Sequence, residues 1–212
     1  KPIKPMVFSG LYPIDSKDYE NLRISLDKLK LNDSSLTFEP NTSAALGFGF
    51  RCGFLGPLHM EIVQERLERE FGLDLISTCP NVNYQVLMKD KSTIKIDNPS
   101  DMPSESIESI YEPYIKIEII NPKEYIGPVI NLCTSHRGVY KSTNFLSPDK
   151  VQLIFEIPLS EIIFEFFEKL KSATKGYASL DYEFIEDRIS KLIKLDIRVS
   201  NDIVDALSII VH

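Results

Sequence analysis

Apolar and polar positions repeat at two spacings along the first part of the chain. Alternation at every second position predicts strands, and recurrence at every third or fourth position predicts amphipathic helices. Turn residues such as proline, asparagine and glycine separate these runs. The predicted elements are a strand at 6–12, a helix at 16–30, strands at 36–38 and 44–50, a helix at 58–71, and strands at 73–77 and 82–88.

The same order of elements returns after a stretch of residues that has no periodicity. Ile115, Ile117 and Ile119 alternate with polar residues, and the next apolar stripe has helical spacing. The expected elements are a strand at 114–119, a helix at 121–138, strands at 139–145 and 151–157, a helix at 159–170, and a strand at 178–184.

Both halves therefore have the order β-α-β-β-α-β, which is typical of the ferredoxin-like fold. We expect an α+β protein of two tandem ferredoxin-like split βαβ units (βαββαβ), each with two helices on one face of an antiparallel sheet. The other face of each sheet is expected to be free for partners. The predicted domains are 1–88 and 111–186, with a linker at 89–110 and a C-terminal extension at 187–212 that packs on the second domain or begins another one.

Composition narrows the class of protein. The 212 residues include 24 basic and 31 acidic residues, so the formal net charge is −7. No region is basic overall, which argues against nonspecific binding of duplex DNA. No apolar run is long enough for a transmembrane segment, and three scattered cysteines fit a reducing cytoplasm. Because the sequence starts at Lys1 without methionine or a signal peptide, we expect a fragment of a longer protein.

Nucleotide and metal motifs are missing from the sequence. There is no phosphate-binding loop of the type G-x-x-x-x-G-K-[ST], and the glycines at 47–53 miss the dinucleotide-binding spacing. His59 and His136 have no second ligand at metal spacing, and Cys52 is expected to be a packed thiol. Arg51, in an expected loop before a helix, fits an anion-binding residue and a plain surface charge equally well.

Two loops of the second unit are the strongest candidates for binding. They follow the two predicted helices, and we expect them to lie side by side at one edge of the sheet. Cations interleaved with an aromatic side chain suit a phosphate backbone and a splayed base. The alternative is that these cations only complement the helix C-termini. The predicted patch consists of His136, Arg137, Lys141, Lys171, Lys175 and Tyr177.

Four segments resemble LepA (elongation factor 4), a family of bacterial translational GTPases. They are residues 4–13 (KPMVFSGLYP), 46–56 (LGFGFRCGFLG), 58–62 (LHMEI) and 174–179 (TKGYAS), and the resemblance extends along the whole chain. Pro57 departs from the leucine that is more common in the family. Residues 186–189 replace a stretch that contains glycine, an aromatic residue and proline.

The resemblance implies a domain assignment and a role. Residues 1–88 would correspond to the third domain of elongation factor G and 111–186 to its fifth, without the GTPase domain. No catalytic residue and no cofactor is then expected here, since GTP and magnesium belong to the GTPase domain of the parent. The parent would act on stalled or backtracked elongating ribosomes by back-translocation, in the cytoplasm, with peripheral association on the inner face of the cell membrane.

The resemblance also implies partners and contact residues. The partners would be the ribosome, through rRNA and ribosomal proteins near the stalk base and the decoding side of the small subunit, and the parent's GTPase domain; a monomer is expected. Two other hypotheses are a metabolite-binding regulatory module and a structural coupling element without contacts of its own. The residues expected to contact rRNA or ribosomal protein are Arg51, His59, His136, Arg137, Lys141, Lys171, Lys175 and Tyr177.

Overall fold

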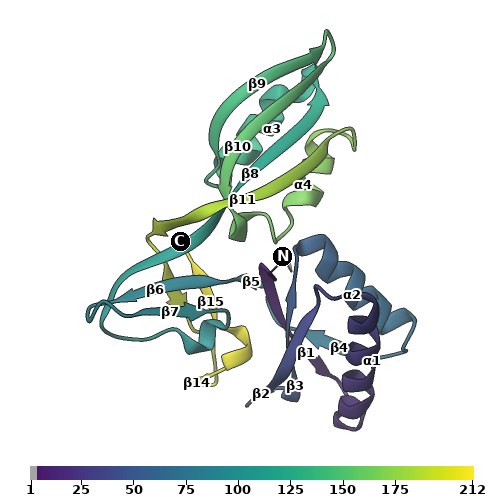
Figure 1. Ribbon diagram of the computed structural model, residues 1–212, viewed down its shortest axis with the longest axis vertical. Coiled ribbons are helices and arrows are strands. Elements are labelled where there is room, and N and C mark those ends of the chain that lie inside the picture. The colour runs from purple at the N-terminus through teal and green to yellow at the C-terminus, as the bar shows by residue number, and fades with distance from the viewer. Residues whose placement is uncertain (1–3) are drawn as a thin grey trace. The chain divides into compact units, whose positions relative to one another are not determined.

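The computed structural model describes residues 4–212 and divides into two compact units (Figure 1). Unit 1 combines the chain up to Ile110 with the C-terminal segment Lys191–His212, and unit 2 is Tyr111–Ser190. This division differs from the predicted domains, because residues 89–110 and the C-terminal segment both group with unit 1. The chain thus leaves unit 1, forms unit 2 and returns to complete unit 1.

Unit 1 contains the first ferredoxin-like sheet, with the strand order β2-β3-β1-β4 and β5 as an additional partner of β1. Antiparallel pairing joins β1 to β3 from Val7↔Phe54 to Leu11↔Phe50. Figure 1 shows α1 and α2 on one side of this sheet. The elements are β1 (Val7–Pro13), α1 (Tyr19–Asn32), β2 (Thr37–Ser43), β3 (Gly47–Phe54), α2 (Pro57–Arg69), β4 (Leu75–Ser77) and β5 (Asn81–Val82).

The helix-covered face of this sheet forms the core of unit 1. Val7, Leu11, Phe50 and Phe54 are buried there, and Tyr19 at the start of α1 stacks on Phe50 with ring centroids 5.0 Å apart. Each buried side chain of this size contributes roughly 1.5–3 kcal/mol by leaving water. The apolar residues that alternate along β1 and β3 are therefore the ones that face the helices.

The opposite face of the unit 1 sheet is covered, contrary to expectation. Arg51 of β3 lies on it, is only 7% exposed and donates a hydrogen bond to the backbone carbonyl of Asp97. The C-terminal segment reaches it as well, since the Ser43 hydroxyl donates to Asp205 Oδ1 at 2.9 Å. The prediction of a free face was wrong for this unit because the covering segments follow the ferredoxin-like strands in sequence.

Three local predictions in unit 1 also need correction. Residues 39–43, which separate the predicted strands at 36–38 and 44–50, lie inside β2, and this strand tolerates Pro40 because it is an edge strand. The expected loop around Arg51 is part of β3. The expected linker contains β7 (Thr93–Ile96), which pairs with β6 (Tyr84–Met88), and a 3₁₀ turn at Pro99–Asp101.

The C-terminal segment consists of two small ribbons. β12 (Ile193–Leu195) pairs with β15 (Ile209–Val211), and β13 (Arg198–Val199) pairs with β14 (Asp202–Ile203). A 3₁₀ turn at Asp205–Leu207 lies between them. This segment groups with unit 1, whereas the sequence led us to expect that it packs on the second domain or begins another one.

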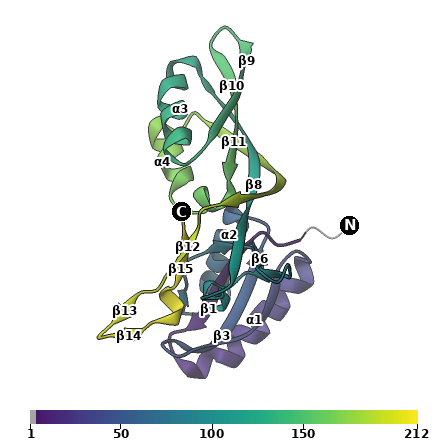
Figure 2. The ribbon, with the colours of Figure 1, turned by 90° about the vertical axis from the view of Figure 1, so that its left-hand side faces the viewer.

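Unit 2 repeats the ferredoxin-like topology with the strand order β11-β8-β10-β9. β10 pairs antiparallel to β8 from Lys150↔Pro122 to Pro158↔Tyr114. Figure 2 shows α3 and α4 together on one face of this sheet. The elements are β8 (Ile107–Pro122, whose first residues belong to unit 1), α3 (Ile126–Ser135), β9 (Val139–Ser147), β10 (Lys150–Pro158), α4 (Phe166–Ala173) and β11 (Ser179–Ser190).

The core of unit 2 lies between this sheet and its helices. Ile115, Ile117 and Ile119 are fully buried, as their alternation predicts, and Phe166 and Leu170 of α4 are buried as well. The predicted helix at 159–170 is interrupted: a 3₁₀ turn at Leu159–Glu161 precedes α4, and Glu165 has a positive φ of 49° before the helix begins. The predicted α+β class with two ferredoxin-like units is confirmed.

Within residues 4–212, no helix combines the length and the apolar character that crossing a membrane requires.

We expect the replacement Asp205→Ala to destabilise unit 1. The Asp205 carboxylate accepts hydrogen bonds from the Ser43 hydroxyl at 2.9 Å and from the Ala44 amide at 3.3 Å, so its loss should cost about 1–2 kcal/mol of unfolding free energy. Hydrogen exchange in urea should show the loss in unit 1 amides and not in unit 2. Asp202→Ala, at an exposed position of β14, is the matched control. Equal protection in both variants would contradict the role of Asp205.

Candidate nucleic-acid interface

The direction of the helices decides which loops of unit 2 can form one site. β8 and β10 are antiparallel, so α3 and α4, which follow them, run in opposite directions. The His136 ring, just after α3, meets the ring of Phe166, the first residue of α4, edge to face with centroids 5.3 Å apart. Burial and Glu124 raise the pKa of Tyr125, before α3, and Tyr177, after α4, adds to this rise, so the two tyrosines are neighbours. The two loops thus lie at opposite ends of unit 2.

The predicted single patch of His136, Arg137, Lys175 and Tyr177 is therefore wrong in geometry. The prediction treated both crossover helices as if they followed parallel strands. The structure instead gives unit 2 two chemically distinct ends: the Arg137 end and the lysine–tyrosine end, the second consisting of Lys123, Tyr125, Lys150, Lys175 and Tyr177.

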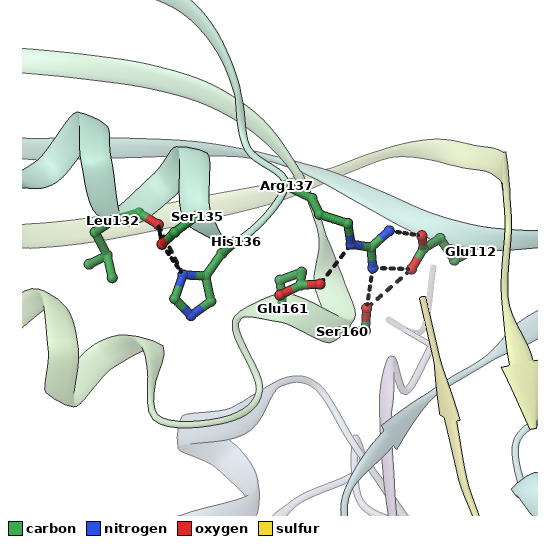
Figure 3. Close-up of polar contacts among 7 residues, drawn as sticks. All are labelled: Glu112, Leu132, Ser135, His136, Arg137, Ser160 and Glu161. Atoms are coloured by element: carbon green, nitrogen blue, oxygen red, sulfur yellow. Dashed lines mark hydrogen bonds and ion pairs between the residues drawn. The ribbon is translucent and has the colours of Figure 1, made fainter. Parts of the chain in front are cut away.

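Arg137 forms the centre of an ion-pair network (Figure 3). Its Nη1 donates to Glu112 Oε1 at 2.6 Å and its Nη2 to Glu112 Oε2 at 3.2 Å, while its Nε donates to Glu161 Oε1 at 2.7 Å. The Ser160 hydroxyl donates to Glu112 Oε2 at 3.1 Å. This is the bidentate geometry in which arginine binds carboxylates most strongly.

Burial makes this network a structural feature of the fold. The Glu112 side chain is fully buried, and that of Arg137 is 21% exposed. Burial alone would lower the pKa of Arg137, but hydrogen bonds from it to Glu112 and Glu161 raise that pKa above its usual value. The guanidinium therefore stays charged, and each of its three nitrogens donates to a partner within the unit. Arg137 ties the end of α3 to β8 and to the turn before α4.

Backbone geometry fixes the position of Arg137. Its φ is +59°, and the amide of Gly138 donates to the carbonyl of Cys133 at 2.8 Å. A Cβ atom at Gly138 would lie 2.6 Å from that carbonyl oxygen, so glycine is required by close approach. The left-handed residue after α3 is thus Arg137, one position before the end of the predicted helix at 121–138.

His136 is also engaged internally. Its Nδ1 lies 2.9 Å from the carbonyl oxygen of Leu132 and 3.1 Å from the Ser135 hydroxyl (Figure 3). With its ring against Phe166, the side chain supports the end of α3. The predicted contact of His136 with rRNA stays a prediction, and the structure gives it a packing role.

The helix-free face of the unit 2 sheet carries paired charges. Lys141 of β9 reaches Glu156 of β10 at 3.4 Å, and Arg188 of β11 binds the same carboxylate at 2.8 Å. The Arg188 guanidinium also lies 4.8 Å from the centroid of the Tyr114 ring. Lys116 makes a second set of ion pairs, with Glu118 and Glu183. Most cations on this face therefore already have a carboxylate partner.

The lysine–tyrosine end has a different character. Lys123, Lys150 and Lys175 are exposed, and Tyr177 is 69% exposed. The Lys123 amide donates to the Asp149 carbonyl at 2.9 Å, which holds the turn between β9 and β10 beside the end of β8. Lys171 is exposed too, although it contacts Glu168 at 3.2 Å. Glu124 and Asp149 are the acidic neighbours in sequence.

The loop after α4 presents its side chains on a fixed backbone. The Gly176 amide donates to the Lys171 carbonyl at 2.8 Å, and the Tyr177 amide donates to the Thr174 carbonyl at 3.0 Å. Lys175 has a φ of +49° and Gly176 a φ of +80°. These bonds satisfy the end of the helix and direct Lys175 and Tyr177 outward, where an exposed aromatic ring and a cation can meet a nucleotide.

The two candidate residues of unit 1 are engaged within the fold, Arg51 as a buried and His59 as a partly buried side chain. Arg51 lies in β3, where its Nη2 donates to Asn81 Oδ1 and to the Asp97 carbonyl. His59 links the two helices: its Nδ1 accepts from the Leu55 amide at 2.9 Å, and its Nε2 lies 2.7 Å from Asp33 Oδ2. Since Nδ1 is an acceptor, Nε2 carries the proton. The expected loop position of Arg51 was wrong, and both residues stabilise unit 1.

Sequence reasoning missed several of the residues that shape these sites. Lys123, Tyr125 and Lys150 carry no motif, and they join the lysine–tyrosine end only through the fold. Glu112 shares the alternation of Tyr114 and of the other residues on the helix-free face, so the sequence indicates an exposed position for it. Its burial depends on Arg137, which is 25 residues away. Among the described residues, no group of three potential metal ligands is brought together.

Comparison with known proteins identifies the class first. A family profile described as "Elongation factor G C-terminus" matches residues 109–198, which include all of unit 2. A crystal structure of a protein from Thermus thermophilus resembles 90% of this chain and 41% of its own, with a TM-score of 0.58 and 16% identity. That likeness shows the fold alone. Residues 109–198 are thus similar to the C-terminal part of elongation factor G.

Sequence relatives then identify the family. The chain is 57% identical to elongation factor 4 of Staphylococcus haemolyticus and 58% identical to that of Chlorobaculum parvum, in each case over 100% of this chain and 35% of the relative. It is 59% identical to elongation factor 4 of Mycobacterium tuberculosis over 99% of this chain and 32% of the relative. The chain belongs to the elongation factor 4 (LepA) family and spans about a third of the length of these relatives.

We expect Arg137→Met to destabilise unit 2 strongly. The change leaves the fully buried Glu112 carboxylate without its cation, which should cost about 3 kcal/mol of unfolding free energy in urea titrations. Lys141→Met breaks a half-exposed ion pair and should cost less than about 1 kcal/mol. The double variant Arg137→Met/Glu112→Leu should recover most of the loss. Similar stabilities for Arg137→Met and Lys141→Met would argue against the network.

The stability of unit 1 should depend on acid pH through Asp33. Burial raises the pKa of Asp33, but hydrogen bonds from Ser35 and His59 lower it below its ordinary 3.8. The ionised form therefore stabilises the folded state above that value, and the contribution disappears as the pH falls through the lower folded pKa. Asp33→Asn should flatten this acid dependence in urea titrations, whereas Asp27→Asn on the exposed face of α1 should not. If stability depended on pH in the same way in both variants, Asp33 would make no such contribution.

Proposed function

We propose that this chain is a ribosome-contacting, non-catalytic part of a translational GTPase that acts in protein synthesis. The observation that carries the proposal is identity of 56–59% to elongation factor 4 along the whole chain. The profile of the elongation factor G C-terminus over unit 2 supports it. GTP and magnesium would be bound by the GTPase domain of the parent, and the 212 residues contain no phosphate-binding loop motif.

The lysine–tyrosine end is the surface that best fits contact with RNA. Its lysines are exposed, and Tyr177 offers a ring on which an unpaired base can stack. The other surface of unit 2 that is rich in cations, the helix-free face, pairs its charges internally. With a net charge of −7, the chain can attract phosphate only locally, and three exposed lysines at one end supply such a place.

This proposal assigns different tasks to the predicted contact residues. Lys175 and Tyr177, with Lys171 beside them, would contact rRNA. Arg137 and His59 would instead keep the two units in the shape that docking requires, because their polar atoms are already hydrogen-bonded within the fold. Arg51 and His136 would have the same structural role. Lys141 would take part in the ion pairs on the helix-free face of the unit 2 sheet.

The finer parts of the proposal follow from the family. Unit 1 would correspond to the third domain of elongation factor G and unit 2 to the fifth, with contacts near the decoding side of the small subunit and near the stalk base. The parent protein would act in the cytoplasm on stalled or backtracked ribosomes. Peripheral membrane association is not part of this proposal, since no feature of the described residues supports it.

Co-sedimentation with purified ribosomes across a salt series tests the docking surface. Lys123→Glu/Lys175→Glu should weaken binding and reduce the slope of log affinity against log salt by about 1 for each lysine–phosphate pair that the variant removes. Tyr177→Ala should weaken binding without changing that slope, because stacking releases no counterions. Both changes lie at exposed positions and should leave folding intact.

The matched control is Lys17→Glu/Lys95→Glu, which makes the same charge change at exposed positions of unit 1. Binding that weakens equally in both double variants would indicate nonspecific attraction and contradict the assignment. Charge reversal of Arg137 is unsuitable here, because it would also break the buried pair with Glu112. A chain that sediments with ribosomes only as part of the full-length protein would favour the structural coupling hypothesis.

A further inference from the structure

The outward face of α1 in unit 1 carries apolar side chains that the core does not use. Leu22, Leu26 and Leu29 of this helix are buried, whereas Ile24 is 40% exposed and Leu31 is 87% exposed. No other large apolar side chain in the part of the chain that the structure describes is as exposed as Leu31. Ile24 and Leu31 are two helical turns apart, about 10 Å along the axis, so they form one strip along the helix.

A shallow open groove of about 410 Å³ follows this strip. Its lining consists of Ile24, Asp27, Lys28, Lys30 and Leu31, so Asp27 is the only acidic residue of the groove. The lining belongs entirely to unit 1. The RNA contact proposed for unit 2 therefore does not use it.

Aromatic rings position the two lysines of the groove. The Nζ atom of Lys28 lies 6.0 Å from the centroid of the Phe71 ring, just after α2, and that of Lys30 lies 5.3 Å from the centroid of the Phe38 ring in β2. These distances are typical of cation–π contacts. The ammonium groups are thus drawn toward two different elements, while the aliphatic side chains of the strip stay exposed.

The same two lysines lack an acidic partner. Arg23 Nη1 binds Asp27 Oδ2 at 3.1 Å and so matches the one carboxylate of the groove. On α2, both arginines have a glutamate partner four residues away. Within residues 4–212 no carboxylate forms an ion pair with Lys28 or Lys30, whose ammonium groups contact only the rings. The groove therefore carries two unmatched positive charges.

Further exposed apolar side chains lie at the start of α2. Leu58 is 64% exposed and Ile62 is 48% exposed. His59 Nε2 lies 2.7 Å from Asp33 Oδ2, so the start of α2 is beside the end of α1, where Leu31 is located. Exposed apolar side chains that gather on one surface are typical of a contact with a partner.

The chemistry of this surface argues against two classes of partner. An unpaired nucleotide needs an exposed ring on which to stack, and Phe38 and Phe71 are only partly exposed and lie beside the lysines. An anionic membrane needs a cluster of cations, and the groove has two in a chain with a net charge of −7. A protein segment with apolar side chains and carboxylates matches both the strip and the lysines.

We propose that this face of unit 1 binds an acidic amphipathic helix of a partner protein. Apolar side chains at positions i, i+3, i+4 and i+7 of that helix would cover Ile24 and Leu31, because these positions repeat at the spacing of the strip. Glutamate or aspartate beside them would pair with Lys28 and Lys30. The contact is small, so the affinity would be low. This site goes beyond the RNA contact and adds a protein partner to it.

Titration of the ¹⁵N-labelled 212-residue chain with a synthetic helical peptide tests the proposal by NMR. The peptide has leucine at positions i, i+3, i+4 and i+7 and glutamate on both sides of this stripe. It should give saturable shifts centred on the amides of Ile24, Lys28 and Leu31. The same peptide with lysine in place of glutamate should bind at least about ten-fold more weakly. The glutamate peptide with serine in place of leucine should give no saturable shift.

Variants of the chain identify the groups involved. Lys28→Gln/Lys30→Gln removes both charges and should weaken binding of the glutamate peptide about five-fold, and Leu31→Ser should weaken it by a similar factor. All three positions are exposed, so folding should be preserved. The matched control is Lys95→Gln/Lys191→Gln, at exposed positions of unit 1 outside the groove, which should leave the affinity unchanged.

Four results would overturn the proposal. Absence of saturable shifts in α1 with the glutamate peptide would exclude the site. Equal affinity for the lysine peptide, or unchanged affinity in Lys28→Gln/Lys30→Gln, would remove the basis for an acidic partner. In the full-length protein, Leu31→Cys should react with a maleimide as fast as in the 212-residue chain. Protection in the full-length protein alone would show that the parent itself covers this face.

Discussion

Antiparallel pairing of the two central strands is the constraint on which the rest of each unit depends. In unit 1 it joins β1 to β3, and in unit 2 it joins β8 to β10. Because each helix follows one of these strands, the two helices of a unit run in opposite directions over one face. The loops that follow them must then lie at opposite ends. Unit 2 accordingly has one end held by the Arg137 ion pairs and another that presents lysines and tyrosines.

These two ends show how the same residue types serve opposite purposes. At the Arg137 end, the guanidinium is matched by the buried carboxylate of Glu112, so its charge is neutralised inside the fold and leaves little for a partner. At the other end, Lys175 and Tyr177 are held on a backbone whose own hydrogen bonds are complete. Their side chains are therefore free to meet a ligand. Counting cations in a loop cannot distinguish these cases, whereas burial of the partner carboxylate can.

Much of the fold could be predicted from the sequence because it follows from local patterns. The alternation of Ile115, Ile117 and Ile119, and the helical spacing of the apolar stripes, lead directly to two βαββαβ units. The errors arise where polar residues are buried by distant segments. Arg51 meets Asp97, which is 46 residues away, and Ser43 meets Asp205, which is 162 residues away. Patterns within a short stretch of sequence cannot indicate pairs that are so far apart. The prediction of a single patch failed for another reason, because it depended on the relative direction of the two helices.

The guanidinium groups of Arg51, which is buried, and of Arg137, which is partly buried, have different surroundings. Arg137 faces carboxylates in a fixed bidentate geometry, so its surroundings are electrically complete. Arg51 donates to an amide oxygen and a backbone carbonyl, and although burial lowers its pKa, the nearby carboxylates of Asp97 and Asp101 act in the opposite direction. Burial costs a charged group so much that a fold retains it only where a counter-charge is present or can arrive. The first arginine has its counter-charges in direct contact, and the second has them nearby, at Asp97 and Asp101 of the segment that covers the sheet.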